Sequence, residues 1–150
     1  MAVLRDRPYL SSHFLVDFGD GNARTASGGF SEVIFPEFVI ATGKRAAASR
    51  AQKAPADSIV ERQSTNVILK RGVLGALDLY DWWNKTRLGK APKGRTLNVQ
   101  LLAEDQETVV MSWRFTNVRP VALAYSPLRA NETSVLIETL ELAFDRMEMQ

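Results

Sequence analysis

Residues that could perform chemistry are few and widely separated in this 150-residue sequence. His13 is the single histidine and cysteine is absent, whereas a zinc site needs several nitrogen or sulfur ligands. No serine lies in the pattern of a nucleophile elbow, so His13 is predicted to be an ordinary strand side chain. Asp78 and Asp81 are carboxylates that could act as an acid–base pair or bind a cation. Their spacing of three residues on a helix is, however, typical of a solvated helix face.

The other polar motifs also lack the pattern of a catalytic or cofactor site. Gly19-Asp20-Gly21 has neither the lysine of a P-loop nor the third glycine of a dinucleotide fingerprint. The acidic run Glu104-Asp105-Gln106-Glu107 is too short for a calcium loop and indicates a turn. The sequence therefore predicts a protein that is not an enzyme and that holds no cofactor and no metal.

Length and composition indicate one globular domain that comprises residues 1–150. The hydrophobic share of 45% and the charged share of 24% are near the globular average. No apolar run approaches the roughly 20 residues needed to span a bilayer, and the first residues lack a signal-peptide core. We expect a protein made in the cytoplasm, without membrane insertion.

Positive charge is concentrated in the middle of the chain. Residues 44–95 contain twelve Lys and Arg against four Asp and Glu, whereas the remainder contains seven against thirteen. Lysine and arginine are the residues that contact phosphates, so one interpretation of the 44–95 region is a nucleic-acid-binding module. Residues 41–63 contain no aromatic side chain, although aromatics usually accompany such contacts. The same residues are predicted to form a long extended basic loop.

Hydrophobic periodicity predicts a chain dominated by strands. Alternating apolar residues favour strands, and the strands at 95–103 and 108–117 are predicted to form an antiparallel hairpin. Spacings of three and four predict one helix, whose apolar stripe includes Leu74, Leu77, Tyr80 and Trp82. The expected strands are 10–18, 30–40, 65–70, 95–103 and 108–117, and the expected helix is 74–85.

Two segments near the end of the chain are ambiguous. Residues 118–128 contain two prolines and are predicted to be an irregular connection or an edge strand. Residues 133–147 are rich in Leu, Glu and Ala, so propensity alone favours a helix. Val135, Leu136 and Ile137 favour a strand instead.

Five motifs in order resemble the phage tail tube family, the inner tube proteins of contractile phage tails and contractile injection systems. The central motif is a strand that ends in Leu69-Lys70-Arg71-Gly72, followed by an aromatic helix with Tyr80 and Trp82. The others are Phe14-Leu15-Val16 with Gly29-Phe30-Ser31-Glu32-Val33, Val99-Gln100-Leu101-Leu102 with Glu104-Asp105, Trp113-Arg114-Phe115 with Arg119-Pro120, and Val135-Leu136-Ile137-Glu138-Thr139-Leu140-Glu141-Leu142-Ala143.

This resemblance implies a mainly β fold, a β-barrel or sandwich of two antiparallel sheets with one flanking helix, and makes residues 133–147 a strand. It implies a structural subunit: six copies form a ring, and rings stack into a hollow tube for cargo or DNA. The implied partners are further copies of the chain, a contractile sheath protein, and baseplate and tube-initiator proteins. The implied location after assembly is an extracellular, cell-anchored or virion-like particle.

A hypothesis for ring stacking follows from the charges. The basic loop offers Lys44, Arg45, Arg50 and Lys53. A neighbouring copy would supply an acidic partner surface made of Glu138, Glu141 and Asp145.

Overall fold

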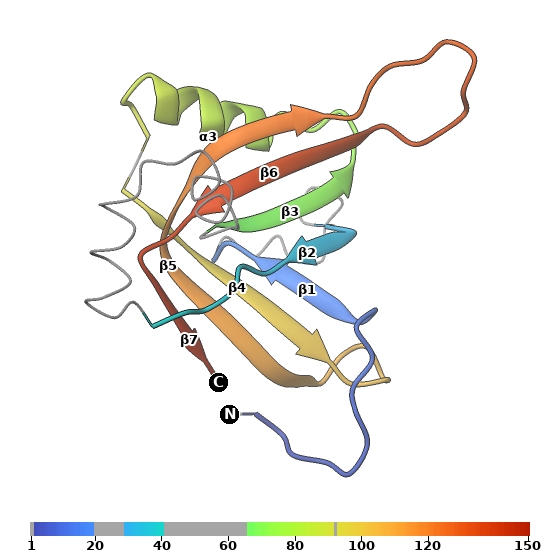
Figure 1. Ribbon diagram of the computed structural model, residues 1–150, viewed down its shortest axis with the longest axis vertical. Coiled ribbons are helices and arrows are strands. Elements are labelled where there is room, and N and C mark those ends of the chain that lie inside the picture. Colours follow the sequence, from blue (N-terminus) through green and yellow to red (C-terminus); the bar gives the residue numbers. More distant parts are fainter. Residues whose placement is uncertain (1, 20–28, 41–65, 92) are drawn as a thin grey trace, which may run out of the picture.

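The computed structural model describes residues 2–19, 29–40, 66–91 and 93–150 (Figure 1). Antiparallel strands account for most of the regular structure in these ranges, with one helix among them. The predicted mainly β fold with one helix is confirmed. In chain order the elements are β1 (Phe14–Asp17), β2 (Glu32–Ile34), β3 (Val67–Gly72), α3 (Asp78–Arg87), β4 (Arg95–Leu102), β5 (Val109–Tyr125), β6 (Ile137–Ala143) and β7 (Arg146–Met149).

The long strand β5 connects two halves of one sheet. Its 17 residues follow a path of about 55 Å. The first part pairs with β4 and β7, and the last part pairs with β6. We call β1, β4, β7 and the first part of β5 the first half-sheet, and β2, β3, β6 and the last part of β5 the second half-sheet. The described strands follow the order β1-β4-β5-β6-β3-β2, with β7 paired to β5 beside this path, so the two half-sheets are joined through β5.

One hydrophobic core joins the two half-sheets and the helix. Side chains of β1, β4 and β5 from the first half-sheet share a cluster with side chains of β3 and β6 from the second and with two residues of α3. Apolar burial is the dominant stabilising term in folding, so this shared core explains why the sheet bends at β5. The buried members are Val16, Val67, Leu69, Leu79, Trp82, Leu97, Val99, Phe115, Val118, Leu140 and Leu142.

The helix differs from the prediction in its start and in its buried face. It begins at Asp78, four residues later than predicted. Leu79 and Trp82 are its buried residues, whereas Leu74 and Leu77 are about two-thirds exposed, at 67% and 65%. The predicted apolar stripe through Leu74 and Leu77 was therefore wrong, because both residues precede the helix and do not face the core.

Residues 133–147 contain strand and no helix. β6 alternates strictly between buried and half-buried positions, with Leu140 and Leu142 in the core. The strand reading is confirmed, and helical propensity is overridden because β6 pairs with β3 on one side and β5 on the other. A second short strand, β7, follows at Arg146–Met149.

Irregularities account for the remaining differences within the strands. A register shift lies between Leu101 and Leu102, and Leu102 is buried whereas Leu101 is half-buried, although alternation from Leu97 and Val99 would have placed Leu101 on the inner face. Residues 119–125 continue β5 and pair with a described strand only on the β6 side, which confirms the predicted edge strand. A second register shift lies next to Pro120, where a ladder donor is missing. The strand predicted for 30–40 is shortened to Glu32–Ile34, two residues before Pro36.

Candidate functional site

The signature Leu69-Lys70-Arg71-Gly72 lies on β3 and alternates between two faces of the second half-sheet. Leu69 and Arg71 are buried, and Lys70 and Gly72 lie on the opposite, outer face. The antiparallel register places Arg71 directly opposite Glu138 of β6. Two charged side chains that are 67 residues apart in the sequence therefore meet inside the protein.

Arg71 is the centre of a buried charge cluster. Its side chain is only 2% exposed. The Nε of Arg71 donates a hydrogen bond to the Glu138 carboxylate, and its Nη2 donates one of 2.5 Å to the Asp78 carboxylate. The Phe30 ring centre lies 5.4 Å from the guanidinium carbon. Burial acts to lower the pKa of Arg71, but the hydrogen bonds to Asp78 and Glu138 outweigh burial and raise it.

Tyr125 extends this cluster across a third strand, because it lies opposite Glu138 in the pairing of β5 with β6. Burial and the negative charge of Glu138 raise the pKa of Tyr125. Asp78 is in the first turn of α3, where a carboxylate also interacts favourably with the helix dipole. The cluster therefore ties the start of α3 to β3 and β6, which is a positioning role.

The two aromatic signature residues of α3 have different environments. Trp82 is buried, with its ring in an edge contact 5.4 Å from Phe18 and with Arg95 above it at 4.8 Å. Tyr80 is exposed and lies 6.2 Å from the ring of Trp83. Trp82 anchors the helix to the core, whereas Tyr80 leaves an aromatic ring on the surface.

The three predicted acidic residues do not share one surface. Glu138 is buried and paired with Arg71. Glu141 lies on the outer face of β6, because it is an odd number of residues away from Glu138. Asp145 is exposed beyond the end of β6, and hydrogen bonds from Asn117 and Arg119 lower its pKa. The predicted basic partners Lys44, Arg45, Arg50 and Lys53 lie outside the described residues.

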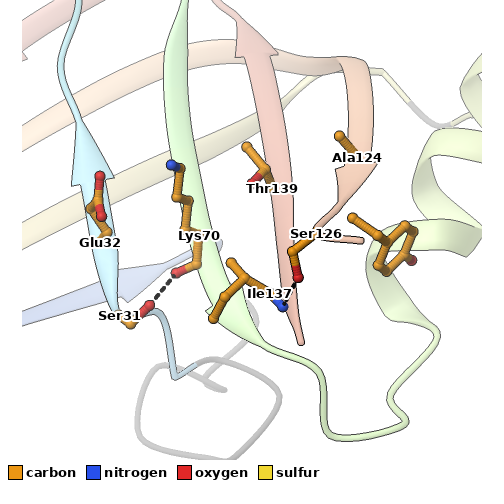
Figure 2. Close-up of a pocket in the computed structure, with 8 residues that line it drawn as sticks. Ser31, Glu32, Lys70, Ala124, Ser126, Ile137 and Thr139 are labelled. Atoms are coloured by element: carbon orange, nitrogen blue, oxygen red, sulfur yellow. Dashed lines mark hydrogen bonds between the residues drawn. The ribbon is translucent and has the colours of Figure 1, made fainter. Parts of the chain in front are cut away.

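The outer face of the second half-sheet carries an open groove that was not predicted from the sequence. Figure 2 shows Lys70 and Thr139 projecting from neighbouring strands, with Glu32 beside them. The period-two alternation of β3 and β6 was the signal that would have placed these side chains together. The groove has a volume of about 420 Å³ and is lined by Ser31, Glu32, Lys70, Ala124, Tyr125, Ser126, Ile137 and Thr139.

The sheet also has open edges. β1 and β2 stand at the two ends of the strand order, and neither pairs with a described strand on its outer side. An unpaired strand edge presents backbone N–H and C=O groups that can pair with another chain. In this protein both edge strands are short, with four residues in β1 and three in β2.

The buried Arg71 has a positioning role, and the open sheet edges offer backbone groups that can pair with another chain. The chain belongs to the T4-like virus tail tube protein gp19 family, which it matches over residues 10–148. The members of this family are structural proteins of the tube, and this chain is accordingly a structural subunit of that kind. The predicted resemblance is confirmed.

Several solved structures share the fold of this chain. The cap that terminates the tube of the anti-feeding prophage is 19% identical, with 100% of this chain and 95% of that chain covered and a TM-score of 0.69. The PVC sheath–tube complex of an extracellular contractile injection system in its extended state contains a chain that is 22% identical, with 97% and 93% covered and a TM-score of 0.66. Hcp1 from Flavobacterium johnsoniae is 12% identical, with 91% and 93% covered and a TM-score of 0.53.

No curated protein matches the chain. In the described ranges, no helix is long and apolar enough to cross a membrane. The same residues contain no group of three or more His, Asp or Glu side chains arranged to hold a metal ion.

Proposed function

We propose that this chain is the building block of the inner tube of a contractile injection system or phage tail. Six copies close into a ring with a central channel, and the rings stack into a hollow tube through which cargo or DNA passes. The observation that carries this proposal is the match to the tail tube family over residues 10–148.

The similar structures support partners outside the tube. They are chains from a sheath–tube complex, from a tube-terminating cap and from a baseplate. We infer that this chain assembles in the cytoplasm, starting from baseplate and tube-initiator proteins, and that a contractile sheath protein surrounds the tube. The finished tube then belongs to an extracellular, cell-anchored or virion-like particle.

Physical reasoning favours a closed ring for a chain with this sheet. The unpaired backbone groups of an open edge promote pairing with another chain. A head-to-tail contact between identical copies can pair these groups, and it forms a closed ring when the rotation from one copy to the next completes a full turn. A ring has no free lateral site once it is closed, whereas its two faces differ and can stack without limit. A tube of stacked rings is therefore a natural assembly for this subunit.

The basic loop gives a test of ring stacking. Reversing Lys44, Arg45, Arg50 and Lys53 to glutamate is expected to leave single rings intact and to prevent tube growth, because the reversed loop would repel exposed carboxylates of the next ring, such as Asp145. Negative-stain microscopy of purified protein measures ring and tube populations. The control exchanges Lys for Arg and Arg for Lys at the same four positions, which keeps every charge. Tubes of normal length in the reversed variant would refute this role of the loop.

The alternative is a nucleic-acid-binding module that uses residues 44–95, and the structure removes one cation from it. Arg71 is buried and paired with two carboxylates, so its guanidinium is not available to a phosphate.

A further inference from the structure

One end of the molecule combines exposed apolar side chains with unpaired positive charge. On the solvent side of α3, Tyr80 contacts Trp83, and the Arg87 guanidinium lies 5.4 Å from the centre of the Trp83 ring. Leu77 is exposed next to them. Tryptophan, tyrosine and arginine are the residues most often found at the energetic centre of protein interfaces. We call this surface, together with the exposed cations Lys85, Arg87, Lys90 and Lys93, the basic end.

The cations of the basic end have no acidic partner within the described part of the chain. They are exposed and lie in the last turn of α3 and in the connection to β4. Asp81 lies one helical turn before Lys85, but none of these four cations forms an ion pair with a described carboxylate, so their positive charge is available to another molecule. These residues are Lys85, Arg87, Lys90 and Lys93.

The opposite end of the molecule has negative charge, from Asp105 and Glu107, which form no ion pair with a described residue, and from Glu104, which is paired with Arg5. The turn between β4 and β5 exposes Glu104, Asp105 and Glu107. Hydrogen bonds from Thr108 and from the backbone of Glu107 lower the pKa of Asp105 to about 2, so this turn keeps its charge at neutral pH. We call this turn and the chain segment beside it the acidic end.

The segment beside the acidic turn supplies an apolar contact. Arg5 forms an ion pair of 2.8 Å with Glu104, and the N–H of Val3 donates to the carbonyl of Val110. These two contacts hold the start of the chain against the turn. Between them, Leu4 is 97% exposed, so an apolar side chain is held in solvent by a fixed backbone.

The two ends are too far apart to neutralise each other within one copy. Figure 1 shows β4 running from the side of the molecule where α3 lies to the opposite side, where the turn to β5 begins. Its eight residues span about 26 Å. The Debye length at physiological salt is only about 8 Å. Attraction between the basic and acidic ends therefore acts between copies.

We propose that the basic end of one copy docks on the acidic end of the next in a head-to-tail contact, with the exposed face of α3 against the turn of residues 104–107 and Leu4. The proposal rests on the proposed function, because it names the surfaces through which copies of a tube subunit meet. Both surfaces combine apolar side chains with charge of opposite sign. Two different surfaces that fit each other give a heterologous contact, which propagates from copy to copy.

Charge exchange tests this contact. The double variant Lys85→Glu/Lys90→Glu and the single variant Glu107→Lys are each expected to raise the concentration at which assemblies form by about tenfold, which corresponds to 1.4 kcal/mol. In the chain that carries all three changes, the introduced positive charge at position 107 can face the introduced negative charges at positions 85 and 90, so part of this loss is expected to be recovered. Light scattering against concentration and negative-stain microscopy give the measurement, and thermal melting of each variant checks that it is folded.

Two further variants isolate the effect. Arg146→Glu on β7 reverses an exposed cation outside both ends and is expected to leave assembly unchanged. Leu4→Ser is expected to weaken assembly without lowering the melting temperature, because its side chain is almost fully exposed in the single chain. Raising salt from 0.1 to 1 M shortens the Debye length from about 10 to 3 Å and is expected to weaken assembly of the parent protein.

The outcomes separate this contact from the proposed function. If the parent chain forms rings or tubes and the charge variants do so at the same concentration, the contact is wrong while the tube function stands. If assembly is lost in the reversed variants and no recovery follows in the combined variant, charge complementarity between these ends is also refuted. A parent chain that never assembles would contradict both the function and the contact.

Discussion

Replacing Arg71 with methionine is expected to lower the free energy of unfolding by about 3–5 kcal/mol, the cost of leaving a buried charge without its partner. The Glu138 carboxylate is 4% exposed and has Arg71 as its ion-pair partner. Methionine retains the length and apolar stem of arginine but cannot donate a hydrogen bond. Urea denaturation followed by tryptophan fluorescence and circular dichroism measures the loss.

Neighbouring positions provide matched controls for this prediction. Lys70→Met changes the same charge on the outer face of the same strand, and is expected to stay within about 0.5 kcal/mol of the parent chain. The double variant Arg71→Met/Glu138→Leu removes both members of the buried pair and is expected to recover much of the stability. A single Arg71→Met variant that is as stable as Lys70→Met would show that the cluster does not hold the fold together.

The second large effect is expected at Phe115, where truncation to alanine should cost about 3–5 kcal/mol through lost apolar contact and a residual cavity. The side chain is fully buried. Its ring packs edge-on against Phe144 at 4.8 Å and lies 6.4 Å from Phe35. Phe115 lies on the part of β5 that pairs with both β4 and β7, so its loss would loosen the junction of the two half-sheets.

The same denaturation experiment measures this second effect. Val121→Ala, on the exposed part of the same strand, is expected to change stability by less than about 0.5 kcal/mol. Phe115→Leu retains most of the apolar volume and is expected to be milder than alanine. Equal losses for the alanine variants at Phe115 and Val121 would contradict the position of the core.

Strand alternation made much of the fold predictable from the sequence. Leu97 and Val99 face the core as their spacing indicated, and the hairpin of β4 and β5 pairs as expected. The burial of Leu102 in place of Leu101 was not predictable, because a bulge adds a residue without a distinctive local sequence. Spacing rules locate a strand well, but they assign faces only up to the first irregularity.

The segment of β6 shows the limit of local propensity. Leu, Glu and Ala favour a helix in isolation, yet pairing on both sides makes this segment a central strand. The resemblance to tail tube proteins gave the correct assignment because it carries information about these distant partners. The buried pair of Arg71 and Glu138 was beyond spacing rules for the same reason, since only the register of β3 against β6 brings them together.

The candidate surfaces were predicted less well than the fold. Glu138 was assigned to an acidic surface, but an acidic residue at an inward position of a strand is buried with a partner instead. Conversely, Leu77 and Tyr80 were placed on an apolar stripe of the helix and are exposed. Exposed apolar side chains that gather into a patch are typical of surfaces that meet another molecule.

Electron microscopy of the purified chain at increasing concentration tests most directly whether copies complete one another's sheets in a closed circle. The predicted result is class averages with sixfold symmetry around a central hole, and end-to-end stacks of these particles as concentration rises. Folded single molecules throughout that range, with no sixfold class, would contradict the account.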